Sequence, residues 1–144
     1  METNLNKYAS IIYRQAQRYY DRELSKYGIG CGQQFFLLHI HSNQGTSMYD
    51  LAQLGHFDKG TVTKAVQKLE EEDYIRIEVD AKDRRIRRLY TTEKAEAVFQ
   101  AVYDMRVKWN GVMTEGMTEE EVRTASRLMA KMAENVYHYM NGGI

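Results

Sequence analysis

Apolar side chains recur at helical spacing along most of the chain, and the intervals between these runs divide it into predicted elements. Residues 5–26 carry apolar positions close to this spacing, and we expect Gly28 and Gly30 to end the helix. Residues 33–41 (QQFFLLHIH) predict a second, compact apolar helix that stops near the turn SNQGT. Because the sequence has no proline, long uninterrupted helices are favoured and glycine must end them.

Two further helices are predicted next, each with a polar residue suited to cap its first turn. Ser47, followed three residues later by Asp50, predicts a short helix through Leu54 that Gly55 closes. Asp58 is the expected N-cap of the following helix, which covers DKGTVTKAVQKLEEED.

The helix that begins after Asp58 has one apolar and one polar face. Val62, Val66 and Leu69 fall at positions i, i+4 and i+7, so they form the predicted buried face. The opposite face, with Thr61 on its flank, is small, polar and basic and consists of Gly60, Thr63, Lys64, Gln67 and Lys68. Acidic residues follow only at the end of the helix. This arrangement suits a helix whose first half enters a DNA groove.

A hairpin and two long helices complete the pattern. The runs IRIEV (75–79) and IRRLY (86–90) alternate apolar and polar residues around the polar segment AKDRR, which predicts a β-hairpin. A long helix is expected from about Thr92 to about Thr114. Thr118 and Glu121 form a capping box for a last helix. This helix carries an apolar seam made of Val122, Ala125, Met129, Met132, Val136 and Met140.

The charge is balanced over the whole chain but not along it. The 144 residues include 20 basic and 20 acidic side chains, so the formal net charge is zero. Five basic side chains nevertheless fall within the hairpin region, opposed there only by Asp83; they are Lys82, Arg84, Arg85, Arg87 and Arg88. A local positive field is sufficient to attract phosphate, because salt screens charges beyond about 10 Å. Since Arg87 and Arg88 are adjacent in a strand, one of them must face inward or sideways.

Composition narrows the class of protein. We expect a single domain, since 144 residues bury one substantial core but not two. The first residues lack the pattern of a secretion signal, and no apolar run approaches the roughly 18 residues of a membrane span. The lone cysteine, Cys31, excludes an internal disulfide and fits a reducing compartment. We therefore expect a soluble, cytoplasmic protein.

The order of the predicted elements indicates the fold class. A short helix, a tight turn and a basic helix make a helix-turn-helix, and an appended hairpin makes it winged. The predicted fold is therefore mainly α, with a small β-hairpin wing.

The segment 48–95 (MYDLAQLGHFDKGTVTKAVQKLEEEDYIRIEVDAKDRRIRRLYTTEKA) resembles the DNA-binding core of MarR-type transcriptional regulators. The matching motifs are LAQ before the turn, DKGTVTK at the start of the basic helix, LE at its end and DRR at the wing tip. The resemblance implies dimerisation helices at 1–30 and 115–144, a DNA-binding region at 31–95 and a connecting helix at 92–114. The chain departs from the family at Gly60, where serine is common, and at Asp73, where glycine is usual. Thr91 and Ala95 replace the family's leucine and glycine.

The same resemblance implies roles for individual residues. Lys64, Thr61 and Thr63 would face the major groove, with Gln67 available to an adenine, while Arg85 would enter or border the minor groove. An ion pair between Asp58 and Arg85 would fix the wing against the helix. The remaining DNA-facing residues, expected mainly at phosphates, are Ser47, Lys59, Lys68, Lys82, Arg84 and Arg87.

The resemblance also implies a homodimeric repressor of a pseudo-palindromic operator, released by a small aromatic effector. Aromatic residues at helical spacing usually belong to a core or a dimer interface. If an effector pocket exists, the candidate residues are Tyr13, Tyr20, Phe36, Met105 and Trp109.

Parts of the sequence also suggest functions other than DNA binding. A redox role for Cys31 rests on its expected place near a helix start, where the helix dipole would lower its pKa. A zinc site near His39 and His41 would also need histidine or carboxylate ligands from the long helix after the wing, and residues 106–112 contain none. An enzyme that uses Cys31 as nucleophile and His39 as base would need a glycine-rich oxyanion loop, which the sequence lacks. A fourth alternative is an interaction module that has lost DNA binding. We expect no enzyme activity, metal or cofactor.

Overall fold

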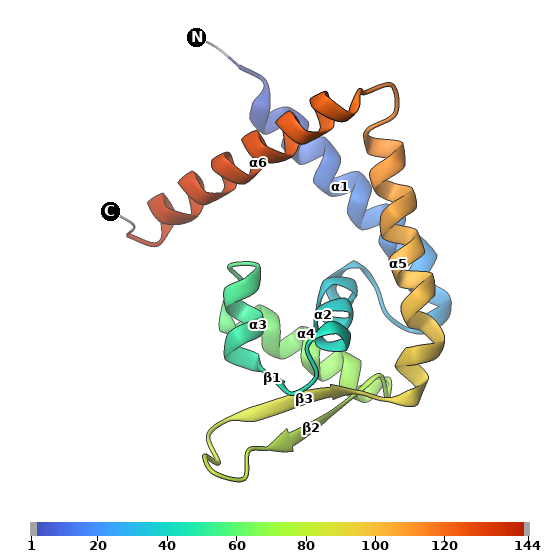
Figure 1. The fold of residues 1–144 in the computed structure, drawn as a ribbon, viewed down its shortest axis with the longest axis vertical. Coiled ribbons are helices and arrows are strands. Elements are labelled where there is room, and N and C mark those ends of the chain that lie inside the picture. The colour runs from blue at the N-terminus through green and yellow to red at the C-terminus, as the bar shows by residue number, and fades with distance from the viewer. Residues whose placement is uncertain (1–2, 143–144) are drawn as a thin grey trace. The chain divides into compact units, whose positions relative to one another are not determined.

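The computed structural model describes residues 3–142 and divides the chain into two units, which meet within one helix between Val107 and Lys108 (Figure 1). The helices are α1 (Leu5–Leu24), α2 (Cys31–Ser42), α3 (Met48–Leu54), α4 (Lys59–Glu71), α5 (Glu93–Met113) and α6 (Glu119–Met140). A short 3-10 turn, η1 (Ser25–Tyr27), follows α1. The strands are β1 (Thr46–Ser47), β2 (Ile75–Val79) and β3 (Arg87–Thr91). The predicted fold class, mainly helical with a small hairpin, is confirmed.

The ends of the helices follow the predicted capping signals. The side chains of Ser47, Asp58 and Thr118 accept hydrogen bonds from the backbone N–H three residues later, as N-caps do. The first helix is shorter than expected and closes through η1, where Gly28 adopts a left-handed φ of 78°. Asp73, which stands in place of the family's glycine, is also left-handed, with a φ of 62°. There Asp73 N–H donates to Glu70 O and the next N–H to Leu69 O, which ends α4.

The three strands form an antiparallel sheet in the order β1-β3-β2. The hairpin of β2 and β3 was predicted, although its second strand begins at Arg87 because the Ile86 N–H bonds to Asp83 O within the turn. Strand β1 was not predicted, since a two-residue strand carries no periodic signal. In the register, Ser47 of β1 faces Arg88 of β3, and Glu78 of β2 faces the same residue from the other side.

The core of the first unit is built around α2, which packs against α1, α4 and β3. The predicted buried face of α4 is confirmed, with Val62, Val66 and Leu69 at most 1% exposed. Leu89 of β3 and Leu51 of α3 close the core from the hairpin and the turn. This packing gives α4 a single buried side and leaves its polar side in solvent.

The second unit contains the end of α5 and α6. In α6 no residue is buried, and four residues of its apolar seam, Met129, Met132, Val136 and Met140, are exposed. Among the residues that the structure describes, no helix is long and apolar enough to cross a membrane.

The core position of Leu51 predicts a large loss of stability on truncation. Leu51→Ala should lower the free energy of unfolding by about 2–5 kcal/mol, because it removes packed methyl groups and leaves a cavity. Leu54→Ala, on the same helix at 55% exposure, should change it by about 0.5 kcal/mol or less. Urea denaturation of both variants measures the difference. Equal losses would contradict the assignment of Leu51 to the core.

Candidate nucleic-acid interface

Helix α4 presents a polar, exposed face beginning at its capped first turn. The Asp58 carboxylate accepts a hydrogen bond from Thr61 N–H at 2.7 Å, and this bond is the main cause that lowers the pKa of Asp58. The Thr63 hydroxyl donates to Lys59 O at 2.8 Å, which leaves its lone pairs directed away from the helix. Thr61, Thr63 and Lys64 are exposed, so the face assigned to DNA is accessible.

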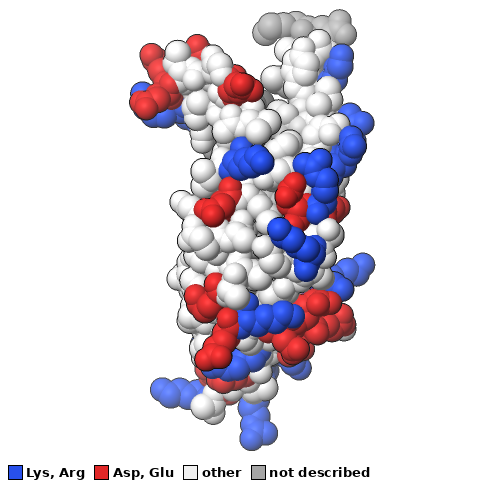
Figure 2. Space-filling view, turned by 90° about the vertical axis from the view of Figure 1, so that its right-hand side faces the viewer, with Lys and Arg blue, Asp and Glu red and all other residues white. Residues whose placement is uncertain are grey.

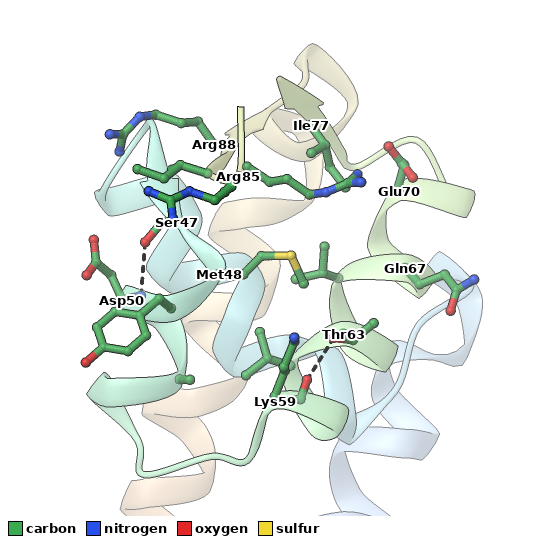
Figure 3. A pocket seen from close by; sticks show the side chains of 16 residues that line it. Ser47, Met48, Asp50, Lys59, Thr63, Gln67, Glu70, Ile77, Arg85 and Arg88 are labelled. Atoms are coloured by element: carbon green, nitrogen blue, oxygen red, sulfur yellow. Dashed lines mark hydrogen bonds between the residues drawn. The ribbon is translucent and has the colours of Figure 1, made fainter. Parts of the chain in front are cut away.

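Helices α3 and α4 and the hairpin line one groove with a volume of about 1020 Å³. Figure 3 shows Lys59, Thr63 and Gln67 along α4, with Met48 reaching into the groove from the start of α3. Residues of the hairpin, Arg85 and Ile77 among them, border the groove from across. The basic hairpin and the polar helix therefore share one surface.

Six of the eleven residues predicted to contact DNA line this groove: Ser47, Lys59, Thr63, Gln67, Arg85 and Arg87. Four others, Thr61, Lys64, Lys82 and Arg84, are exposed on the same two elements but are not part of the groove lining. Lys68 is half-buried and forms an ion pair with Glu72 at 3.4 Å, so its charge is partly compensated.

The floor of the groove was not anticipated from the sequence. It is apolar and includes Met48, Val66 and Ile77, with Glu70 as an acidic member of the lining. Met48 and Tyr49 directly follow the Ser47 cap, and helical geometry places the first turn of α3 beside the groove. Two successive apolar residues after a helix cap could line a groove or pack in the core, and the sequence pattern alone does not distinguish the two.

The resemblance implies an ion pair between Asp58 and Arg85, but in the structure Arg85 has a different partner. The Arg85 guanidinium instead binds Asp83, with Nε and an Nη donating to the two carboxylate oxygens at 3.0 and 2.9 Å. Asp58 is occupied as the cap of α4. A carboxylate two residues away in the same turn is already in reach of Arg85, whereas the Asp58 carboxylate is engaged by the backbone of its own helix.

Arg88 turns sideways from the hairpin, as the alternation of Arg87 and Arg88 predicts. Its Nε donates to Asp80 Oδ1 at 3.0 Å, and an Nη donates to Gly45 O at 3.1 Å. Arg87 remains exposed on the groove side. Asp80 also accepts from the backbone N–H groups of the turn, and these bonds lower its pKa.

Charge is distributed unevenly over the surface. On the face drawn in Figure 2, basic and acidic side chains are intermixed over most of the area. Basic side chains project from its lower end, the end at which Figure 1 draws the hairpin. Since the formal net charge of the chain is zero, the concentration of basic side chains at the hairpin is a local feature.

The expected activation of Cys31 by the helix dipole is wrong. Cys31 is the first residue of α2, but burial and the nearby Asp21 carboxylate raise the pKa of its thiol. Asp21 accepts the Cys31 N–H at 2.7 Å, so a negative charge occupies the helix start. His39 packs on Phe35, and His41 Nε2 lies 2.8 Å from Glu96 Oε1, within hydrogen-bond distance.

The residues proposed for an effector pocket differ in their surroundings. Tyr20 and Phe36 are buried in the core of the first unit, and Met105 accepts a hydrogen bond from Tyr19 at its carbonyl. Tyr13 is 64% exposed, and Trp109 belongs to the second unit.

Comparison with known proteins gives consistent results. The model of the MarR family matches residues 33–86. The chain is 30% identical over 105 residues to the uncharacterized HTH-type transcriptional regulator YybA of Bacillus subtilis, covering 73% of this chain and 70% of that protein. It is 27% identical over 134 residues to the HTH-type transcriptional regulator BilQ of Clostridium symbiosum, covering 93% of each.

Solved structures agree with this assignment. A MarR protein from Peptoclostridium difficile superposes with a TM-score of 0.90 at 26% identity, covering 96% of this chain and 91% of that one. The curated relatives are named as regulators, in agreement with the prediction that the chain is not an enzyme.

The lowered pKa of Asp58 predicts an acid-sensitive start of α4. A carboxylate whose pKa is lower in the folded state stabilises the fold above its unfolded pKa, about 3.9, and this contribution is lost as pH falls toward the folded value. The Thr61 amide NMR signal should therefore shift with a midpoint below about 3.9. Asp58→Asn keeps an acceptor and removes the titration, so its Thr61 signal should stay flat. A midpoint at or above the ordinary value would contradict the cap.

Proposed function

The chain belongs to the MarR family of transcriptional regulators, and we propose that it is a repressor that binds a pseudo-palindromic DNA operator as a homodimer. The observation that carries this proposal is the groove shared by α4 and the hairpin. Its rim holds exposed cations and hydrogen-bonding side chains from both elements, as a surface for a sugar–phosphate backbone requires.

The proposed division of labour follows from the position of each element. Helix α4 would enter the major groove with Thr61, Thr63 and Lys64, and Gln67 offers paired donor and acceptor groups to an adenine. Arg85 would reach the minor groove, where its exposed guanidinium exchanges Asp83 for the negative potential of the DNA. The remaining residues of the set would lie at phosphates or near them; they are Ser47, Lys59, Lys68, Lys82, Arg84 and Arg87.

Dimerisation explains the exposed apolar residues at both ends of the chain. Helix α6 exposes Met129, Val136 and Met140, and α1 exposes Leu5 and Tyr8, which is unfavourable for side chains of this size in water. A second copy of the chain would cover these surfaces. Two-fold symmetry would then set two copies of α4 about one DNA turn, ~34 Å, apart.

Release by a small aromatic effector is the part of the proposal that rests on family resemblance. Since Tyr20 and Phe36 are buried in the core of the first unit, an effector that reaches them must displace packed side chains. Such a displacement would change the spacing of the two α4 helices, and a loss of about 2–3 kcal/mol in binding would empty most sites.

The groove predicts salt-dependent binding of duplex DNA. With about five phosphate contacts per subunit, a dimer neutralises about ten phosphates, so log K should fall with log salt at a slope near −9. Fragments selected from genomic DNA by the purified protein supply the operator. Fluorescence anisotropy at several salt concentrations measures the slope.

Replacing Lys64 or Arg85 by Ala should weaken operator binding about tenfold or more, because each change removes two contacts from the dimer. Lys131→Ala removes the same charge from α6 and should leave binding unchanged. If Lys64→Ala and Arg85→Ala both bound the operator with native affinity, these residues would not be part of the DNA-binding surface.

The exposed seam of α6 predicts a dimer that one charge disrupts. Sedimentation equilibrium should give about twice the chain mass of 16.9 kDa for the native protein. Val136→Lys should shift the mass toward the monomer and weaken operator binding, because it buries an unpaired charge in the interface. Ser126→Lys, at an exposed polar position of the same helix, is the matched control. A native protein that sediments as a monomer would refute the dimer.

A further inference from the structure

The hairpin turn is organised by one carboxylate, that of Asp80. Its Oδ2 accepts hydrogen bonds from the backbone N–H groups of Lys82 and Asp83 at 3.0 and 2.8 Å. Its Oδ1 accepts the Nε–H of Arg88 at 3.0 Å. The same side chain therefore shapes the turn and attaches it to strand β3.

Arg88 joins this turn to a third segment of the chain. Besides Asp80, it donates to Gly45 O at 3.1 Å, and the Gly45 N–H in turn donates to Leu89 O at 2.8 Å. Two residues after Gly45 comes Ser47, which pairs with Arg88 in the sheet and caps α3. Arg88 is thus bound on both sides by protein groups and is only half exposed.

A continuous series of hydrogen bonds connects this anchor to the cation at the groove. Asp83, whose N–H is held by Asp80, accepts the N–H of Arg85 at 3.0 Å and its guanidinium at 2.9 and 3.0 Å. The position of Arg85 therefore depends, link by link, on Asp83, on Asp80 and finally on Arg88. Hydrogen bonds from the turn and from Arg88 lower the pKa of Asp80, so its carboxylate stays charged at neutral pH.

We propose that Asp80 and Arg88 are positioning residues of the DNA-binding surface, which hold the hairpin tip beside α4 so that Arg85 reaches the minor groove. Arg88 makes no DNA contact of its own in this arrangement, although it belongs to the basic cluster of the hairpin. The inference rests on the proposed DNA-binding function and adds Asp80 and Arg88 to it as residues that position Arg85.

A double-mutant cycle on operator DNA tests the coupling of Arg88 to Arg85. Arg88→Ala should weaken binding about tenfold in the native background but less than about twofold in an Arg85→Ala background, because the cation that it positions is then absent. Arg87→Ala, on the adjacent exposed side chain, is the matched control. Its fold loss of affinity should be the same in the native and in the Arg85→Ala background. Asp80→Asn should behave as Arg88→Ala does.

Footprinting and a conservative variant add readouts that a general loss of stability would not produce. Arg88→Ala should lose hydroxyl-radical protection where the wing meets the minor groove and keep methylation protection in the major groove. Arg88→Lys retains a cation for Asp80 and should recover part of the affinity. The proposal would be overturned if Arg88→Ala caused the same fold loss of affinity in the native and Arg85→Ala backgrounds, or if it caused no loss at all.

The free protein gives a test that does not depend on DNA. Backbone NMR order parameters for residues 81–86 should be about 0.85 in the native protein and below about 0.6 in Arg88→Ala. In Arg87→Ala they should keep their native values. An equally rigid turn in Arg88→Ala would overturn the positioning role. Native protein that binds no duplex in a salt-dependent manner would instead refute the proposed function, with the NMR result still deciding whether Arg88 holds the turn.

Discussion

The pairing of a two-residue strand with the hairpin is the constraint on which the functional surface depends. Thr46 and Ser47 pair with Leu89 and Arg88, and Ser47 is at the same time the N-cap of α3. The hairpin is therefore fixed to the first residue of the helix-turn-helix by backbone hydrogen bonds. Since Leu89 is fully buried, this register is also held by the core, because a shift by one residue would turn Leu89 outward.

One-sided burial of α4 supplies the second half of the surface. The apolar face formed by Val62, Ala65, Val66 and Leu69 is committed to the core, so the face with Thr63 and Gln67 must point to solvent beside the hairpin. A chain without net charge acquires a local cationic site in this way. Its cations lie on two elements that the core and the sheet hold together, and on the face drawn in Figure 2 acidic and basic side chains are otherwise intermixed.

Competition between local and distant partners explains the ionic contacts that differ from expectation. Arg85 binds Asp83 within its own turn, and Asp58 serves its own helix, so the ion pair across the groove does not form. In both cases a carboxylate already positioned by local geometry satisfies the cation or N–H group with less loss of side-chain freedom than a distant one. At the start of α2 the partner is distant: burial and the carboxylate of Asp21, a residue of α1, raise the pKa of Cys31 and reverse the expected effect.

The sequence by itself determined the helices, their caps and the hairpin, because these depend on residue spacing and on side chains that bond to backbone nearby. Ser47, Asp58 and Thr118 cap their helices as their positions predict, and Asp73 takes the left-handed conformation that the end of α4 requires. Only the tertiary structure decided the groove, strand β1 and the hydrogen bond from Arg88 to Gly45. These depend on distances between segments far apart in the chain, and the pattern along a single segment contains no information about which distant group lies within a few ångströms.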